Sequence, residues 1–157
     1  MQDLDKYLIS ASREGEYEVL SEIIKRGCNI NFQDEKGYTP LIIASYNNQI
    51  KCVEVLLRNT ANIDLPDFGG NTALMGACFK GYLDIVKILI DYGANMNLRH
   101  GNGGTALMFA VMFGRNEIVE YLLNKGADKN VLDNRGQSAL DISINQGNSV
   151  AAELLSQ

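Results

Sequence analysis

Few residues of this 157-residue chain have side chains suited to catalysis or metal binding, and those few are scattered. The only histidine, His100, has no cysteine or carboxylate at a metal-site spacing, and we expect it to stabilise its own turn. The three cysteines, Cys28, Cys52 and Cys78, contain no Cys-x-x-Cys pair. We expect them to be small, buried, apolar residues in a reducing compartment. The sequence therefore predicts neither a metal centre nor a redox site.

Two other features could support chemistry but lack the remaining parts of a site. The run 101–104 is glycine-rich and precedes a predicted helix, yet no Gly-Lys-Ser/Thr follows it, so we interpret it as a hairpin tip and not as a phosphate-binding loop. Carboxylates recur at positions where a solvated helix face explains them better than an acid–base pair: Asp84, Asp91, Glu117 and Glu120. We therefore predict a protein that is not an enzyme and binds no cofactor.

The elements that would position any site come from a repeat of 33 residues. One tripeptide occurs four times at this spacing: Thr39-Pro40-Leu41, Thr72-Ala73-Leu74, Thr105-Ala106-Leu107 and Ser138-Ala139-Leu140. Turn glycines have the same period: Gly37, Gly70, Gly103 and Gly136. A fixed period of this length indicates a solenoid, in which each unit buries its apolar face only against its neighbours.

Each unit has the sequence signals of two helices. The hydroxyl of the leading Thr or Ser can cap the first helix, which we expect over 40–47 in the second unit. A small residue such as Ala44 lets the two helices approach closely. The second helix has apolar residues at helical spacing, as in 85–90, and ends at a glycine such as Gly93.

These spaced positions resemble the ankyrin repeat, a β-turn followed by two antiparallel helices, and the best single match is 67–97. The resemblance covers nearly the whole chain. It implies an all-α ankyrin-repeat solenoid of stacked helix-turn-helix units with β-turn or hairpin tips. We expect one domain, 1–157, with the units 1–33, 34–66, 67–99, 100–132 and 133–157, of which the first and the last cap the stack.

The two predicted caps differ in composition. The first unit lacks the turn motif and has charged residues suited to a solvated end: Asp3, Asp5, Lys6, Arg13, Glu14 and Glu16. The last unit has Ala151 and Ala152 where earlier units carry bulky aliphatic residues. We therefore expect it to end the stack without exposing an apolar face.

The second unit departs from the repeat, because Asn48 and Thr60 replace both of its helix-ending glycines. Asn tolerates a positive φ, whereas β-branched Thr does so poorly. We expect about 1–3 kcal/mol of strain if Thr60 adopts one. The histidine that ankyrin repeats usually carry after the tripeptide is also missing, and packing must replace its hydrogen bonds at four positions: Ile42, Met75, Met108 and Asp141.

Composition limits the partners and the location. The chain has a net charge of −5 and no basic stripe, so we do not expect it to bind nucleic acid. It has neither a signal segment at its start nor a run of about 18 apolar residues. We therefore expect a soluble, cytoplasmic protein that does not bind membranes, is monomeric alone, and binds another protein.

The resemblance also implies where a partner would bind. Ankyrin repeats typically contact other proteins through the hairpin tips and the exposed side of the first helices, which form a concave groove. Aromatic, Met and basic residues gather at these positions, and interface cores favour aromatic residues, Met and Arg. The predicted partner contacts are Tyr38, Tyr46, Phe68, Phe79, Lys80, Arg99, Met112, Phe113 and Arg135. An acidic groove with these anchors would suit a mildly basic partner.

Two alternatives remain at this stage. Tyr46, Phe79 and Met112 align at the period of 33, so they could pack as a ladder between units, and such a ladder can also present its edge to a partner. The main functional prediction is a non-catalytic adaptor, inhibitor or scaffold. The alternative is a catalase-associated accessory protein, like some short bacterial ankyrin proteins thought to deliver haem or protect that enzyme. Haem needs an axial ligand, for which the candidates are Tyr38, Tyr46 and His100.

Overall fold

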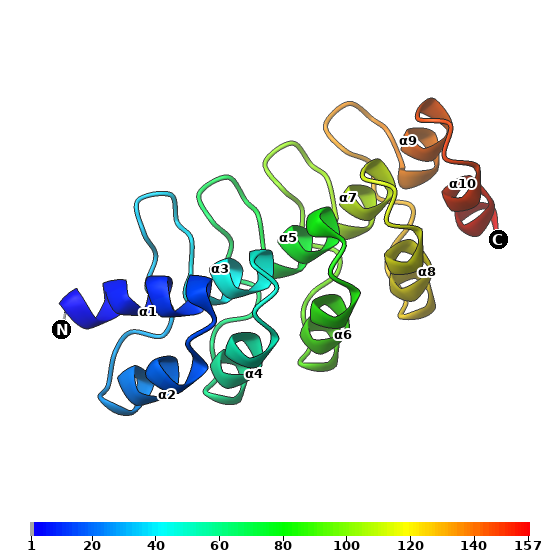
Figure 1. Cartoon of the computed structure of the whole chain (residues 1–157). Helices are drawn as coiled ribbons and strands as arrows, with labels where there is room; N and C mark the ends of the chain where they lie inside the picture. Colours follow the sequence, from blue (N-terminus) through cyan, green and yellow to red (C-terminus); the bar gives the residue numbers. More distant parts are fainter. Residues whose placement is uncertain (1) are drawn as a thin grey trace.

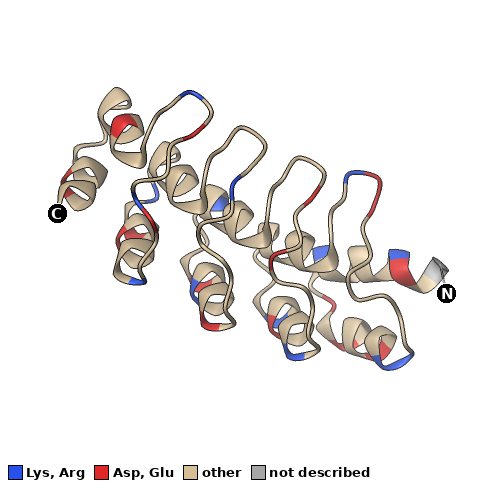
Figure 2. Ribbon diagram, turned by 180° about the vertical axis from the view of Figure 1, so that it is seen from behind, with Lys and Arg blue, Asp and Glu red and all other residues tan. Residues whose placement is uncertain are grey.

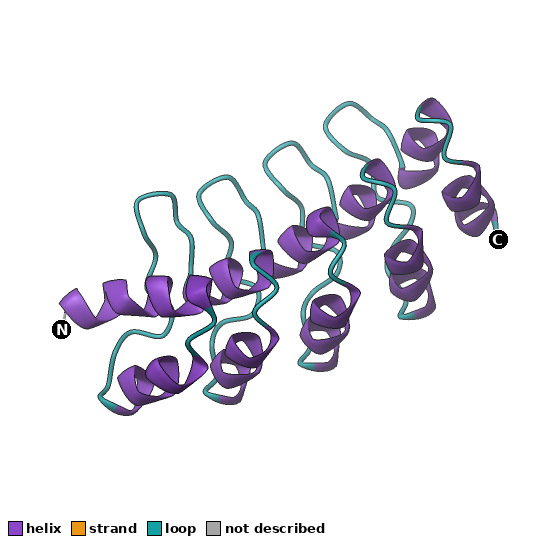
Figure 3. Cartoon of the chain, viewed as in Figure 1, coloured by secondary structure: helices purple, strands orange, loops and turns teal. Residues whose placement is uncertain are grey.

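The computed structural model describes the backbone of residues 2–157 and the side chains of residues 4–157, so the side chain of Asp3 lies outside the described part. Within these residues the chain forms ten α-helices and no strand (Figure 3). The helices are α1 (Gln2–Glu14), α2 (Tyr17–Lys25), α3 (Pro40–Tyr46), α4 (Ile50–Arg58), α5 (Ala73–Lys80), α6 (Leu83–Asp91), α7 (Ala106–Met112), α8 (Asn116–Asn124), α9 (Ala139–Asn145) and α10 (Ser149–Ser156). None of these helices has the length and apolar character needed to cross a lipid bilayer.

The helices stack as five consecutive pairs in one row. The odd-numbered helices form one layer and the even-numbered helices a second, and hairpin-shaped loops project from the first layer away from the second (Figure 1). Each inner odd-numbered helix packs against its own partner and against the odd-numbered helices on both sides. This arrangement confirms the predicted all-α solenoid of stacked helix-turn-helix units.

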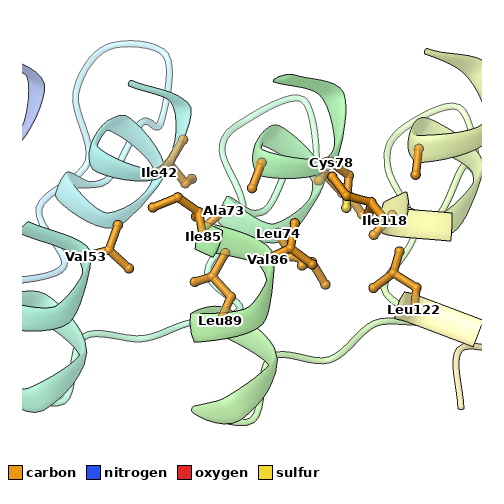
Figure 4. Close-up of a cluster of buried hydrophobic side chains, with 14 of the residues drawn as sticks. Ile42, Val53, Ala73, Leu74, Cys78, Ile85, Val86, Leu89, Ile118 and Leu122 are labelled. Carbon is orange, nitrogen blue, oxygen red and sulfur yellow. The ribbon is translucent and has the colours of Figure 1, made fainter. Parts of the chain in front are cut away.

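One continuous apolar core runs through the stack. The leucine of the repeated tripeptide is buried in three units, as Leu41, Leu74 and Leu107. The even-numbered helices contribute a second row of buried residues: Leu56, Leu89, Leu122 and Leu155. Figure 4 shows three of these side chains, Leu74, Leu89 and Leu122, in the middle of the stack. Because every inner unit is covered on both sides, its burial depends on its neighbours and not on a separate core of its own.

The predicted hydroxyl caps start the odd-numbered helices. The backbone amide of Ile42 donates to the Thr39 hydroxyl over 3.1 Å, and Thr72 and Thr105 accept in the same way. In the last unit the cap is reciprocal, because Ser138 accepts from the amide of Asp141 and the Asp141 carboxylate accepts from the amide of Ser138. The hydrogen bond from the Ser138 amide lowers the pKa of the Asp141 carboxyl.

Hydrogen bonds at two places join neighbouring units. Neighbouring hairpin tips are joined by backbone bonds from the amides of Phe68, Gly101 and Asn134 to carbonyls one unit earlier, over 3.0–3.1 Å. A second ladder lies at the other ends of the units, where the side chains of Asn31, Asp64 and Asn97 accept from amides of the next unit over 2.8–3.0 Å. The histidine position itself is filled by buried apolar residues in three units: Ile42, Met75 and Met108.

The expected positive φ at the two departing residues is confirmed. Asn48 has a φ of 57° and Thr60 a φ of 63°, and among the described residues they are the non-glycine positions with positive φ. The backbone at Thr60 therefore has the positive φ of the equivalent glycines, although a β-branched residue disfavours this conformation.

Thr60→Gly should raise the melting temperature by about 2–4 °C. Relief of about 1–3 kcal/mol of strain exceeds the about 0.5–1 kcal/mol lost to the greater freedom of glycine, and about 1 kcal/mol corresponds to this shift at this chain length. Calorimetry of the folded protein measures it. Asn59→Gly is the matched control, because Asn59 has a negative φ and its backbone amide donates to the Val55 carbonyl. An unchanged or lower melting temperature for Thr60→Gly would refute the strained-cap interpretation.

The C-terminal cap is only partly as expected. Ala151 is buried as a small residue, but Ile144 on α9 is 62% exposed. Its counterparts in the inner units, Ser45, Cys78 and Val111, are fully buried. The small residues of α10 therefore reduce the apolar surface of the second layer only, and the first layer of the last unit keeps an exposed aliphatic side chain.

Candidate partner-binding groove

A concave groove of about 360 Å³ is lined by residues of α3, α5 and α7 and of the hairpins that precede α3 and α5. Aromatic and aliphatic side chains form most of its lining: Tyr38, Ile43, Tyr46, Met75, Phe79 and Phe109. The sequence predicted three of these six as partner contacts. The predicted partner contacts do not include four other residues that line the groove: Asp67, Met75, Gly76 and Phe109.

Three aromatic rings form a row along the ends of α3, α5 and α7. The rings of Tyr46 and Phe79 are stacked with centroids 6.1 Å apart, and Phe113 meets Phe79 edge-on at 4.5 Å. The predicted ladder is thus present for Tyr46 and Phe79, and Phe113 adds a third ring that the alignment did not place in it. Tyr46 is 43% and Phe113 41% exposed, so the row both joins the units and presents its edge to solvent.

The groove is nearly free of charge. The helices α3, α5 and α7 contain a single charged side chain, that of Lys80. Its ammonium lies 5.0 Å from the centroid of the Tyr46 ring and 5.9 Å from that of Tyr82, which are cation–π distances. Figure 2 shows that most of the acidic residues lie on the even-numbered helices and on some loops. The expected acidic groove is therefore only partly correct, because Asp67 is the one charged residue in its lining and the net charge of the chain comes mainly from the opposite layer.

The hairpin tips carry two more of the predicted contacts. Phe68 is 71% exposed, and its ring covers Gly37 of the preceding hairpin so closely that a Cβ on Gly37 would lie 2.7 Å from the ring. Arg135 is exposed at the last tip. Met112, at the end of α7, is 40% exposed. These side chains lie on the same layer as the groove but outside its lining.

Arg99 has a structural role within the hairpins. Its guanidinium donates to the carbonyl of Gly103 over 3.1 Å and to that of Leu132 over 2.9 Å, which links two successive hairpins. Gln33 makes the equivalent pair of bonds two units earlier, to Gly37 and Pro66. Arg99 therefore positions the tips in addition to any contact with a partner.

The candidate haem ligands gain no support from their surroundings. Tyr38 and Tyr46 line the groove, but the Tyr46 ring is already packed against Phe79. His100 serves its own turn as predicted, with Nδ1 2.6 Å from Asn102 Oδ1, and its ring meets Phe109 edge-on. No arrangement among the described residues favours haem over a protein as the ligand.

The cysteines are free thiols and differ in burial. Cys52 and Cys78 are buried as expected, whereas Cys28 is half-buried, so its predicted burial is only partly correct. Burial raises the pKa of Cys52 to about 11, with a further contribution from Glu16, and it also raises the pKa of Cys78. Such thiols are poor nucleophiles at neutral pH.

Iodoacetamide at pH 8 should alkylate Cys28 well before the other two cysteines. The half-buried Cys28 thiol is accessible to the reagent, although burial and Asp5 raise its pKa as well. The buried thiols of Cys52 and Cys78 should react only after unfolding. Peptide mass spectrometry of folded and urea-treated samples measures the three sites separately. Alkylation of Cys78 in the folded protein at the rate of Cys28 would contradict the packing of α5.

Comparison with protein-family models agrees with this architecture. A model described as ankyrin repeats (3 copies) matches residues 8–100, and one described as ankyrin repeats (many copies) matches residues 89–143. The chain therefore belongs to the ankyrin repeat family, whose members are general protein–protein interaction modules. A comparison with curated proteins found no match.

Proposed function

We propose that this ankyrin-repeat chain is a non-catalytic protein-binding module that holds its partner in the groove over α3, α5 and α7 and against the hairpin tips. The observation that supports this most is the aromatic row Tyr46–Phe79–Phe113, exposed at its edge beside three helices that carry one charged side chain, Lys80. Contiguous exposed apolar surface of this kind marks interaction sites. An adaptor, an inhibitor and a scaffold would all use it in the same way.

The construction of this surface favours specific binding. The hairpins are joined by backbone bonds from tip to tip and by the side chains of Gln33 and Arg99. A preformed surface loses little freedom on binding, which favours affinity. The proposed partner contacts are Tyr38, Tyr46, Phe68, Phe79, Lys80, Arg99, Met112, Phe113 and Arg135. A protein is favoured over nucleic acid because Lys80 is the only cation on the three groove helices.

We further propose that the chain is monomeric before it binds and acts in the cytoplasm. Its three free thiols support a reducing compartment. Sedimentation of the isolated chain tests the oligomeric state.

Phe68→Ala should weaken capture of the partner at least tenfold, because an exposed aromatic anchor contributes to binding and hardly to the core. Phe79→Ala should weaken it as well, with some loss of stability. Quantitative pull-down from the native source with mass spectrometry identifies the partner, and titration of the purified pair gives the affinity. The matched control is Val150→Ala, which removes an exposed apolar side chain of α10 in the second layer (54% exposed).

Stability has to be measured on the same variants. A melting temperature for Phe68→Ala within about 1 °C of the wild type, together with weaker binding, supports the proposal. A partner that binds both phenylalanine variants as tightly as the wild type would place the interface elsewhere and overturn it.

A further inference from the structure

The floor of the groove is open because one side chain is missing. Gly76 lies in the interior of α5, where glycine is less stable than alanine. Other units carry large residues at this position: Ile43, Phe109 and Ile142. Space does not require the glycine, since a Cβ on it would only touch Tyr46 at 3.6 Å. The chain thus keeps a helix-weakening residue where it leaves a hollow between Ile43 and Phe109.

An almost fully buried carboxylate lies at the edge of this hollow. Asp67 is 8% exposed and lines the groove. Its Oδ1 accepts from the amides of Gly69 and Asn71 over 2.9 Å and from the Asn71 side chain over 3.3 Å. Its Oδ2 accepts from the Asn71 side chain over 3.1 Å.

This carboxylate has no cationic partner in the described part of the chain. The ion pairs there are those of Arg26 with Glu22 and Arg58 with Glu54, both on even-numbered helices or their ends. The equivalent turn carboxylates, Asp34 and Asp133, are more exposed and lie outside the groove. Hydrogen bonds satisfy the carboxylate but leave its negative charge without a counter-charge, so a cation brought by a ligand would form an ion pair there.

From this juxtaposition we propose that the hollow at Gly76 receives an arginine side chain of the partner protein, whose guanidinium pairs with Asp67 and lies against the aromatic lining of the groove. The inference rests on the proposed function and specifies the chemistry of the partner's anchor. The planar guanidinium combines carboxylate pairing with stacking on aromatic faces, which suits an apolar groove with one buried acid better than the strongly hydrated ammonium of lysine.

The position of Lys80 agrees with cation binding at this groove. Its ammonium already faces the ring of Tyr46, so this ring is open to a positive group. An entering guanidinium displaces the ammonium towards Tyr82, which it also faces. Lys80→Gln removes the competing charge and is expected to tighten binding of an arginine probe.

The test uses N-acetyl-arginine methylamide as the probe, titrated into the ¹⁵N-labelled full chain. The amides of Asn71, Gly76 and Phe79 should shift and saturate in the millimolar range, as expected for so small a ligand. N-acetyl-norleucine methylamide, which has a similar stem without the charge, should bind at least tenfold more weakly. Asp67→Asn should remove this difference, whereas the matched control Asp133→Asn should leave it unchanged.

A second variant separates binding from folding. Gly76→Ile restores the side chain found in two other units and should block the probe while the melting temperature stays equal or rises. Equal binding of the two probes, shifts confined to other surfaces, or unaltered binding by Gly76→Ile would each overturn the arginine site. If partner capture still depends on Phe68 in that case, the proposed function stands and only the anchor is wrong. If the probe binds but capture of the partner protein is unchanged by Phe68→Ala and Phe79→Ala, the proposed function fails instead.

Discussion

Leu89→Ala is expected to lower the free energy of unfolding by about 2–5 kcal/mol, the usual range for truncating a fully buried leucine. Leu89 is completely buried on α6, in the middle of the stack, and α6 contacts both α4 and α8. In a solenoid the total stability is approximately a sum of the stability of each unit and of each interface. A cavity in the central unit therefore weakens two interfaces together. Urea unfolding followed by circular dichroism measures the loss.

Leu155→Ala is the matched control, because Leu155 holds the same position in the last unit and is also buried. Its helix, α10, packs mainly against α8 and α9. We expect a smaller loss of global stability and faster hydrogen exchange confined to α9 and α10. Equal losses for the two variants, with uniform exchange, would mean that the stack unfolds as a single core and not by interactions between neighbours.

Features that repeat in the sequence could be predicted, because each copy obeys the same local physics. The capping hydroxyls of Thr39 and Ser138 lie where the tripeptide placed them. Thr60 has the positive φ that the period imposed on it. These outcomes depend on the backbone conformation within one unit. The residues that set this conformation occur four times at the period of 33, so each copy supports the prediction made from the others.

Features that depend on how neighbouring units meet were predicted less well. The alignment favoured Met112 as the neighbour of Phe79 and did not indicate Phe113, whose ring lies edge-on to that of Phe79. The net charge predicted an acidic groove, but a net charge does not show which layer carries the acidic residues. The groove lining has one of them, Asp67. The sequence signal for the hollow is Gly76. At the equivalent position the first unit has Ser10, and the other three units have large apolar residues.

Gly70→Ala is expected to lower the free energy of unfolding by about 1.5–3.5 kcal/mol. Gly70 has a φ of 88°, which costs an alanine about 1–2 kcal/mol. A Cβ there would also lie 2.9 Å from the backbone nitrogen of Gly101 in the next hairpin. Separation of the two tips would lose the hydrogen bond from Gly101 to Gly69, worth about 0.5–1.5 kcal/mol. Chemical denaturation measures the total.

Gly93→Ala separates the two contributions. Gly93 has a φ of 91°, but nothing lies within 4 Å of a Cβ at this position. The control should therefore cost only the backbone strain, and the difference between the variants measures the contact between hairpins. If the two losses are equal, the tips are not packed on one another, and the preformed surface proposed for the partner loses its structural basis. If Gly70→Ala costs more and also weakens partner binding while Gly93→Ala does not, the register of the tips contributes to binding as well as to folding.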